Sequence, residues 1–424
     1  MIKEPRIPLK PGMAIFLLVL FFLVPSLACN MPQKSGSGNS LITTIQVPEQ
    51  ETIVAEEGVT LVVPPDTVPK DSQVSINPVT DKLAYDYSGL KSLGAYEISI
   101  GNQTEFQNPL EIQIKYDPAA LREDIPAIDQ LFAAYLDETV GRWVESEFRF
   151  DEAGSTVTIQ ADHLTLWALF GLDDDTTVSY TPHFRIYFNE KLNAPLLADK
   201  PSGAGLIFDF AAQVRSALMD AYDRYAAQQG LAMTGFKLPE STNVYIDDWG
   251  AEKTAEWGWF SKNIEIPTSY SDLEELNQDS AHELFHAVQN QYVRVPTMMA
   301  NRWWMEATAD YAAAKIGTNN GLKTVMGLDF IKKPLDDSDS KHMYRVSHFI
   351  DYLVSEGVDF KDLFEATMAS GSPLEGMQNH LRSNGQTLDE AYHDFAQSFV
   401  FGTKLQRESL PSGSLMDLVD YQDE

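Results

Sequence analysis

The 424-residue sequence predicts a multidomain protein, in which an N-terminal antiparallel β-sandwich precedes an α+β domain with a mainly helical C-terminal part. The chain is too long for one ordinary hydrophobic core, so two or more domains are expected. Short β-rich runs broken by turn residues fill its first part, and apolar residues recur at helical spacing in its last part. Hydrophobic residues make up 44% of the sequence, which is enough for packed cores.

The chain is strongly acidic. Lys and Arg number 31 against 62 Asp and Glu, which gives a formal net charge of −31. So acidic a surface repels phosphate backbones, and a nucleic-acid partner is therefore disfavoured. The charge favours solubility and carries no information about the fold.

The first 29 residues have the features of an export signal. A basic start precedes an apolar run over 13–24, and small residues then lead to Cys29, the single cysteine of the chain. A cysteine at the cleavage point is similar to a bacterial lipoprotein signal, in which that cysteine carries the lipid. We therefore predict a lipoprotein-type signal peptide over 1–29 and a flexible tether over 30–40. Lipidation at Cys29 is then the only membrane attachment, on the extracytoplasmic face of the cell membrane.

Two other fates of this segment stay open. Ser26 stands where the lipoprotein pattern usually has Leu, and Ser26 with Ala28 also fits ordinary cleavage, which would release a secreted protein. An uncleaved membrane anchor is the third reading, although the run is short for a membrane span and is followed by Pro25.

The β-sandwich domain is expected over 41–171. Its strand-like runs cover 59–65, 73–79, 96–101, 110–116 and 155–161. The stretch 58–76 and the closing segment 163–171 are similar to the sandwich domain shared by zona occludens proteins, ankyrins and netrin receptors. We interpret it as an extracellular spacer.

An acidic linker is expected over 172–180, beginning with Asp173, Asp174 and Asp175. Three adjacent aspartates could bind calcium, but the alternating ligands of a calcium loop are absent, so a solvated linker is favoured. The second domain then covers 181–402, with strands over 184–190, 243–249 and 263–270 and a helix over 207–230. A polar acidic tail follows over 403–424.

A helix that starts at a capping box, with Ser271 as N-cap and Glu274 reaching back, carries the chemistry. His282 and His286 lie four residues apart, so both imidazoles project from one face and can hold one ion at about 2.0–2.1 Å. Glu283 lies between them in sequence, is rotated about 100° from His282 on the helix, and so flanks the ion and need not bind it. This HExxH arrangement is that of zinc proteases.

Zinc in a catalytic site takes three protein ligands, so a third is required. Glu306 lies on a second predicted helix, 20 residues after His286, and Asp310 follows one turn later. The set resembles the gluzincin metallopeptidases, the zincin-like class that includes thermolysin and the alanyl aminopeptidases. The resemblance implies Glu306 as the third zinc ligand and Asp310 as the group that orients a zinc-bound histidine.

Gluzincins also use a Tyr or His beyond the third ligand to stabilise the oxyanion of peptide hydrolysis. Tyr344, on a predicted helix over 342–353, is our choice, and His348 and His342 compete for the role. In this class a strand before the HExxH helix pairs with the substrate backbone, which suggests 263–270. Glu265 on that strand could bind a free amine, but the Gly-x-Met-Glu-Asn motif is absent, so exo- or endopeptidase action stays open.

The sequence thus predicts an exported zinc metallopeptidase that cleaves peptide or protein substrates with zinc-activated water and Glu283 as general base. The alternative is a surface binding or adhesion lipoprotein with an inactive zincin module. A third possibility keeps the metal for a hydrolysis other than peptide cleavage.

Overall fold

The computed structural model describes residues 41–45, 52–79, 83–189, 210–226, 235–250, 253–259, 261–270, 272–316, 322, 326 and 330–401. The predicted signal peptide with Cys29, the tether over 30–40 and the tail over 403–424 lie outside the described residues. Among the residues that are described, no helix combines the length and the apolar character needed to cross a membrane.

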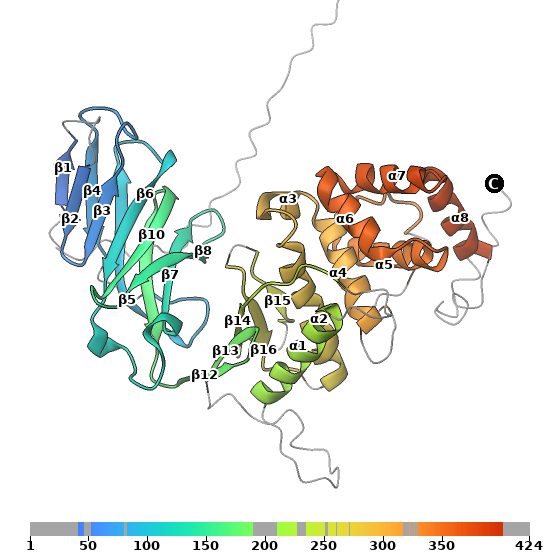
Figure 1. Ribbon diagram of the computed structural model, residues 1–424, viewed down its shortest axis with the longest axis horizontal. Helices are drawn as coiled ribbons and strands as arrows, with labels where there is room; N and C mark the ends of the chain where they lie inside the picture. The colour runs from blue at the N-terminus through green and yellow to red at the C-terminus, as the bar shows by residue number, and fades with distance from the viewer. Residues whose placement is uncertain are drawn as a thin grey trace, which may run out of the picture. The chain divides into compact units, whose positions relative to one another are not determined.

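Two antiparallel sheets come first in the chain (Figure 1). The six-stranded sheet has the order β1 (Leu41–Thr44), β4 (Gln73–Pro78), β5 (Leu90–Ile100), β11 (Leu166–Leu172), β7 (Leu131–Asp137) and β8 (Arg142–Ser146). The five-stranded sheet has the order β2 (Thr52–Glu56), β3 (Val59–Val63), β6 (Glu105–Lys115), β10 (Thr156–His163) and β9 (Phe148–Asp151). Two short 3-10 helices, η1 (Pro118–Ala120) and η2 (Ala127–Asp129), lie between β6 and β7.

The alternating pattern of these strands puts one face of each sheet into a common core. In β3 every second residue is buried, and Leu61 pairs with Ile112 of β6, which pairs in turn with Ile159 of β10. Trp167 and Leu169 from the other sheet belong to the same buried cluster. The prediction of an N-terminal antiparallel β-region is therefore confirmed.

A third, mixed sheet follows, with the order β12 (Thr176–Tyr180), β13 (Phe184–Asn189), β14 (Thr242–Asp247), β16 (Ile264–Pro267) and β15 (Glu256–Trp257). The strands β13, β14 and β16 are parallel, and antiparallel strands lie at both edges. All four residues of β16 are buried, as expected for a parallel strand covered on both faces.

The acidic linker expected over 172–180 is shorter than predicted. Thr176–Tyr180 form β12, which pairs with β13 from Thr176 opposite Asn189 to Tyr180 opposite Arg185. The β-branched residues Thr176, Thr177 and Val178 suit a strand, although the prediction assigned the two threonines to the linker together with the adjacent aspartates. Asp173 remains in the turn, where its carboxylate accepts hydrogen bonds from the Asp175 N–H and the Thr176 hydroxyl, each at 3.0 Å.

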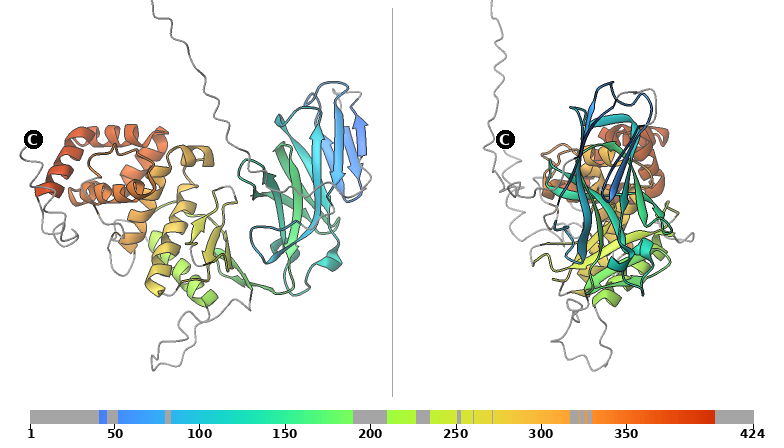
Figure 2. Two further views of the ribbon diagram at one scale, coloured as in Figure 1. Left: turned by 180° about the vertical axis from the view of Figure 1, so that it is seen from behind. Right: turned by 90° about the vertical axis from the view of Figure 1, so that its left-hand side faces the viewer.

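The remaining regular elements among the described residues are helices (Figure 2). They are α1 (Phe210–Ala226), α2 (Leu273–Gln289), α3 (Val295–Ala300), α4 (Arg302–Ile316), α5 (Ser340–Ser355), α6 (Phe360–Ser370), α7 (Pro373–Ser383) and α8 (Leu388–Phe401). Contacts run from the third sheet to α1 and α2, from α2 to α4, and from α4 to α5. The predicted helical C-terminal part is confirmed.

The six-stranded sheet and the third sheet also share buried residues. The rings of Tyr87 and Tyr245 stack with centroids 4.8 Å apart, and Phe132 packs edge-on against Tyr187. The Asp247 carboxylate accepts a hydrogen bond of 2.7 Å from the Ser88 N–H. The N-terminal β-region therefore packs directly against the sheet that precedes the HExxH helix.

Candidate metal centre

The helix α2 presents the HExxH residues from a well-buried position. It begins one residue later than expected: Asp272 is the N-cap, and its carboxylate accepts the Glu274 N–H at 2.8 Å. Asp is as good an N-cap as the Ser271 that we predicted, which itself lies outside the described residues. Leu284 and Phe285 are fully buried and fix the rotation of the helix.

The structure brings three predicted ligand side chains together. One ligand atom from each of His282, His286 and Glu306 lies within 4.8 Å of the others. The Glu306 Oε2 atom is 3.3 Å from His282 Nε2 and 3.6 Å from His286 Nε2. Two ligands at about 2.0–2.1 Å from a tetrahedral ion lie about 3.4 Å apart, so the spacing of these atoms fits zinc.

Gln289, which the sequence argument missed, fixes the orientation of His286. The Nδ1 atom of His286 is 2.8 Å from Gln289 Oε1, so it carries the proton and leaves Nε2 free to bind an ion. The Gln289 amide donates in turn to Met305 O and Thr308 Oγ1 of α4, both at 2.8 Å. Gln289 lies three residues after His286 and therefore on the same helix face, and this spacing could have identified it from the sequence as a partner of His286.

Asp310 and Arg302 lie one turn to either side of Glu306 on α4. Asp310 is buried, and its charge contributes to raising the pKa of His282. Arg302 was not singled out from the sequence, and its Nε atom lies 3.4 Å from Glu306 Oε1. The Glu306 carboxylate thus offers Oε2 to the imidazoles and Oε1 to the guanidinium.

Burial and charge shift the pKa values of this cluster in opposite directions. Burial raises the pKa of Glu283 to about 7, although the neighbouring His282 and His286 lower it. Burial opposes the charged forms of His282 and Glu306 as well. Their mutual hydrogen bond and charges outweigh it, so the pKa of His282 is raised and that of Glu306 is held well below its usual range.

A cavity of about 380 Å³ opens at these residues, and Tyr344 lines it together with Glu283, His286 and Glu306. The Tyr344 ring centroid is 6.1 Å from that of His282. The competing His342 and His348 are not among the described residues that line this cavity. His342 is instead buried and stacks on Phe330 with centroids 4.6 Å apart.

The expected substrate strand over 263–270 is not at the edge of the sheet. The two-residue strand β15 covers β16, with Glu256 opposite Glu265 and Trp257 opposite Ile264. Glu265 is buried and forms an ion pair with Lys253, so its carboxylate does not face the cavity as a free amine-binding group. A strand of two residues has no periodic signal, which is why the sequence did not reveal it.

No protein-family model and no curated protein matches the sequence. Among solved structures it is similar to the M1 zinc metallopeptidase from Deinococcus radiodurans, at 12% identity and TM-score 0.32, covering 84% of this chain and 92% of that one. It is also similar to an aminopeptidase N family protein from Idiomarina loihiensis, at 10% identity and TM-score 0.30, covering 90% and 73%. Leukotriene A4 hydrolase from Saccharomyces cerevisiae has 10% identity and TM-score 0.32, covering 91% and 70%. At TM-scores this low, we draw the function from the geometry of the site.

Proposed function

We propose that this protein is a zinc-dependent metallopeptidase whose ion is held by His282, His286 and Glu306. The observation that carries the proposal is the spacing of their ligand atoms, all within 4.8 Å of one another. Two imidazoles and one carboxylate leave the fourth position of a tetrahedral zinc site open, as in catalytic rather than structural sites. When bound, the ion supplies Lewis-acid polarisation of a peptide carbonyl and of water.

Glu283 then acts as the proton carrier of the reaction. Its pKa is raised by burial to about 7, so near neutral pH it can both accept a proton from water and release it. It passes that proton to the amine that leaves when the peptide bond breaks. The carboxylate lines the same cavity as Tyr344 and Glu306, where a peptide carbonyl would lie.

Tyr344 supplies a hydrogen-bond donor to the oxyanion. Burial and the negative charge of Glu306 raise the pKa of its hydroxyl, so the hydroxyl keeps its proton. A neutral hydroxyl at the cavity wall can donate to the oxygen of the tetrahedral intermediate, where negative charge develops.

Zinc content and peptidase turnover, measured together, test the proposal. We expect about one zinc per chain by elemental analysis, and cleavage of denatured casein that o-phenanthroline abolishes and added zinc restores. Glu306→Ala should lose the zinc, because the two imidazoles alone give a weaker site. Zinc without cleavage of casein or of a peptide library would support the binding-lipoprotein alternative, and no stoichiometric zinc would refute the metal centre.

We further propose that the protein is exported and lipidated at Cys29, from the basic, apolar and small residues that precede it. Processing of Cys29→Ala in globomycin-treated and untreated cells tests this. Wild type should accumulate as the unprocessed precursor with globomycin, and the variant should not be processed at all. Equal processing of both proteins would rule out lipidation.

A further inference from the structure

A network of ion pairs joins the N-terminal β-region to the strand beside the candidate metal centre. Arg142 of β8 places its guanidinium 3.6 Å from Glu256 Oε1 on β15 and 3.6 Å from Glu265 Oε1 on β16. Its Nε atom lies 3.5 Å from Asp86. Lys253 contacts the same two glutamates from within the second domain. Arg142 and Lys253 therefore form ion pairs with three carboxylates, those of Asp86, Glu256 and Glu265.

The two glutamates would repel each other without this network. Glu256 and Glu265 are directly opposite in the antiparallel pair of β15 and β16, and like charges in that position destabilise a sheet. The Glu265 side chain is only 8% exposed, whereas that of Glu256 is 46% exposed, so water screens the repulsion only in part. Arg142 and Lys253 each contact both carboxylates, and together they offset the repulsion that would separate these two strands.

The strand that Arg142 holds forms a wall of the candidate site. Glu256, Trp257 and Trp259 all line the cavity that contains Glu283, and the Trp259 ring centroid is 5.1 Å from that of His286. Glu256 and Trp259 also line a smaller cavity of about 140 Å³, of which Arg142 is a wall. The side chain of Arg142 therefore lies behind the wall residues that face the metal ligands.

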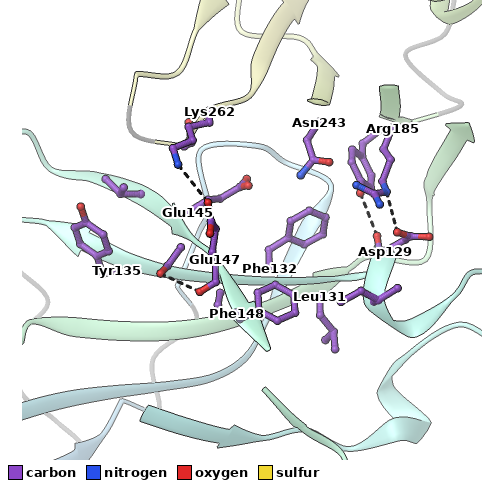
Figure 3. Close-up of a pocket in the computed structure, with 16 residues that line it drawn as sticks. Asp129, Leu131, Phe132, Tyr135, Glu145, Glu147, Phe148, Arg185, Asn243 and Lys262 are labelled. Atoms are coloured by element: carbon purple, nitrogen blue, oxygen red, sulfur yellow. Dashed lines mark hydrogen bonds and ion pairs between the residues drawn. The ribbon is translucent and has the colours of Figure 1, made fainter. Parts of the chain in front are cut away.

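The strand that carries Arg142 is itself fixed to the second domain. Three residues further along β8, Glu145 accepts hydrogen bonds from Tyr85 Oη at 3.0 Å and from Tyr245 Oη of β14 at 2.6 Å. Figure 3 shows Glu145 in a neighbouring cavity, where Lys262 reaches toward Glu147 at a distance of 3.4 Å. These contacts give Arg142 a set position relative to β15.

We propose that Arg142 is a positioning residue of the candidate active site, and that the N-terminal β-region thereby holds the wall strand β15 in place for substrate. This inference rests on the proposed peptidase function. It assigns to the β-region a part in the enzyme, where the sequence suggested a spacer. The residue just before Glu256 has a second support, because the Tyr270 hydroxyl accepts the Ala255 N–H at 3.0 Å and donates to Asp279 of α2.

Steady-state kinetics of zinc-loaded full-length variants test the positioning role of Arg142. Arg142→Gln leaves the opposed carboxylates with Lys253 alone, and we expect KM for a cleaved fluorogenic peptide to rise about tenfold, with kcat within about twofold. Arg142→Lys keeps the charge, but a lysine ammonium lacks the planar guanidinium that contacts several carboxylates at once. We therefore expect KM to rise about threefold in this variant. The control is Arg149→Gln, which removes an exposed pair with Glu111 at 3.0 Å in the same β-region and should leave KM unchanged.

A second change separates electrostatic positioning from a general loss of stability. Glu265→Gln combined with Arg142→Gln restores the wild-type charge of the cluster, so KM should return toward the wild-type value. Mere loss of folded protein would lower the apparent kcat at unchanged KM, and that result would overturn the proposal.

Hydrogen exchange gives a readout that does not depend on turnover. Amides of 253–259 should exchange faster in Arg142→Gln than in Arg149→Gln, and the Glu265→Gln combination should reverse this. Equal exchange in both single variants would overturn the positioning role. A zinc-loaded wild type that cleaves nothing would instead refute the proposed peptidase function, while the exchange comparison still decides whether Arg142 holds β15.

Discussion

Glu283 and Glu145 are two glutamates whose pKa values are raised to about 7 by burial, yet their surroundings differ. Glu283 lines a cavity beside His286 and lies next to the candidate metal ligands. Glu145 is held by the neutral hydroxyls of Tyr85 and Tyr245, which join the N-terminal β-region to the third sheet. A raised pKa thus reports burial, and the neighbouring groups distinguish a reactive carboxylate from a structural one.

The largest expected effect is the difference in peptidase activity between a variant of Glu283 and a variant of Glu145. Glu283→Gln removes the group that accepts and returns the proton, so kcat for peptide cleavage should fall by about 10²–10⁴-fold while zinc content stays at wild-type level. Glu145→Gln keeps an oxygen that can accept from both tyrosines and should retain activity within about twofold. Initial rates on one peptide, with zinc measured on the same samples, make the comparison.

Similar losses in both variants would show that the two carboxylates are not functionally distinct. Loss of zinc from Glu283→Gln would show that this residue is a ligand and not a base, because a residue that only moves protons is not needed to hold the ion.

A smaller effect is expected for the residue that orients His286. Gln289→Ala removes the acceptor for Nδ1–H and two contacts to α4, so zinc affinity should fall about 10–100-fold. Competition with a chromophoric chelator measures it. Gln291→Ala, at an exposed position two residues on, is the matched control. Equal affinities would mean that His286 needs no orienting partner.

The smallest effect concerns the pH dependence of stability and isolates Glu145. Burial raises the pKa of its carboxyl from the ordinary value of 4.5 to about 7 in the folded chain, so the folded state binds the proton more tightly between these values. Stability from this group is therefore present at low pH and is lost as pH rises through that window. Relative to Glu145→Gln, wild type should lose roughly 1–3 kcal/mol between pH 4.5 and pH 8.

Urea unfolding of both proteins across this pH range measures the difference, and the contribution of Glu283 cancels because both proteins contain it. A difference that stays constant with pH would show that Glu145 titrates normally in the folded chain.

The site residues that share one helix could be predicted from the sequence. The spacing of His282, Glu283 and His286 places them on one helix, and the resemblance to gluzincins implied Glu306 on a second predicted helix, which is α4. Tyr344 is our choice from the sequence over His342 and His348, but the packing of His342 against Phe330 could not be predicted, because it depends on tertiary structure.

The features of the site that depend on contacts between distant segments could not be predicted from the sequence. Arg142 and Glu256 are separated by more than one hundred residues, and neither belongs to a motif. The strand β15 has two residues, so no alternation marks it, and 263–270 was therefore predicted as the strand that pairs with the substrate. The antiparallel β-region and the helical C-terminal part were predictable because their hydrophobic patterns extend over many residues.

Zinc K-edge X-ray absorption of the loaded full-length protein tests the central claim most directly. The account predicts a four-coordinate shell with two imidazole nitrogens, one carboxylate oxygen and one further light atom, all at about 2.0–2.2 Å. Glu306→Ala should change that shell and weaken binding. A spectrum without imidazole scattering, or one left unchanged by Glu306→Ala, would contradict the assignment of this ion to His282, His286 and Glu306.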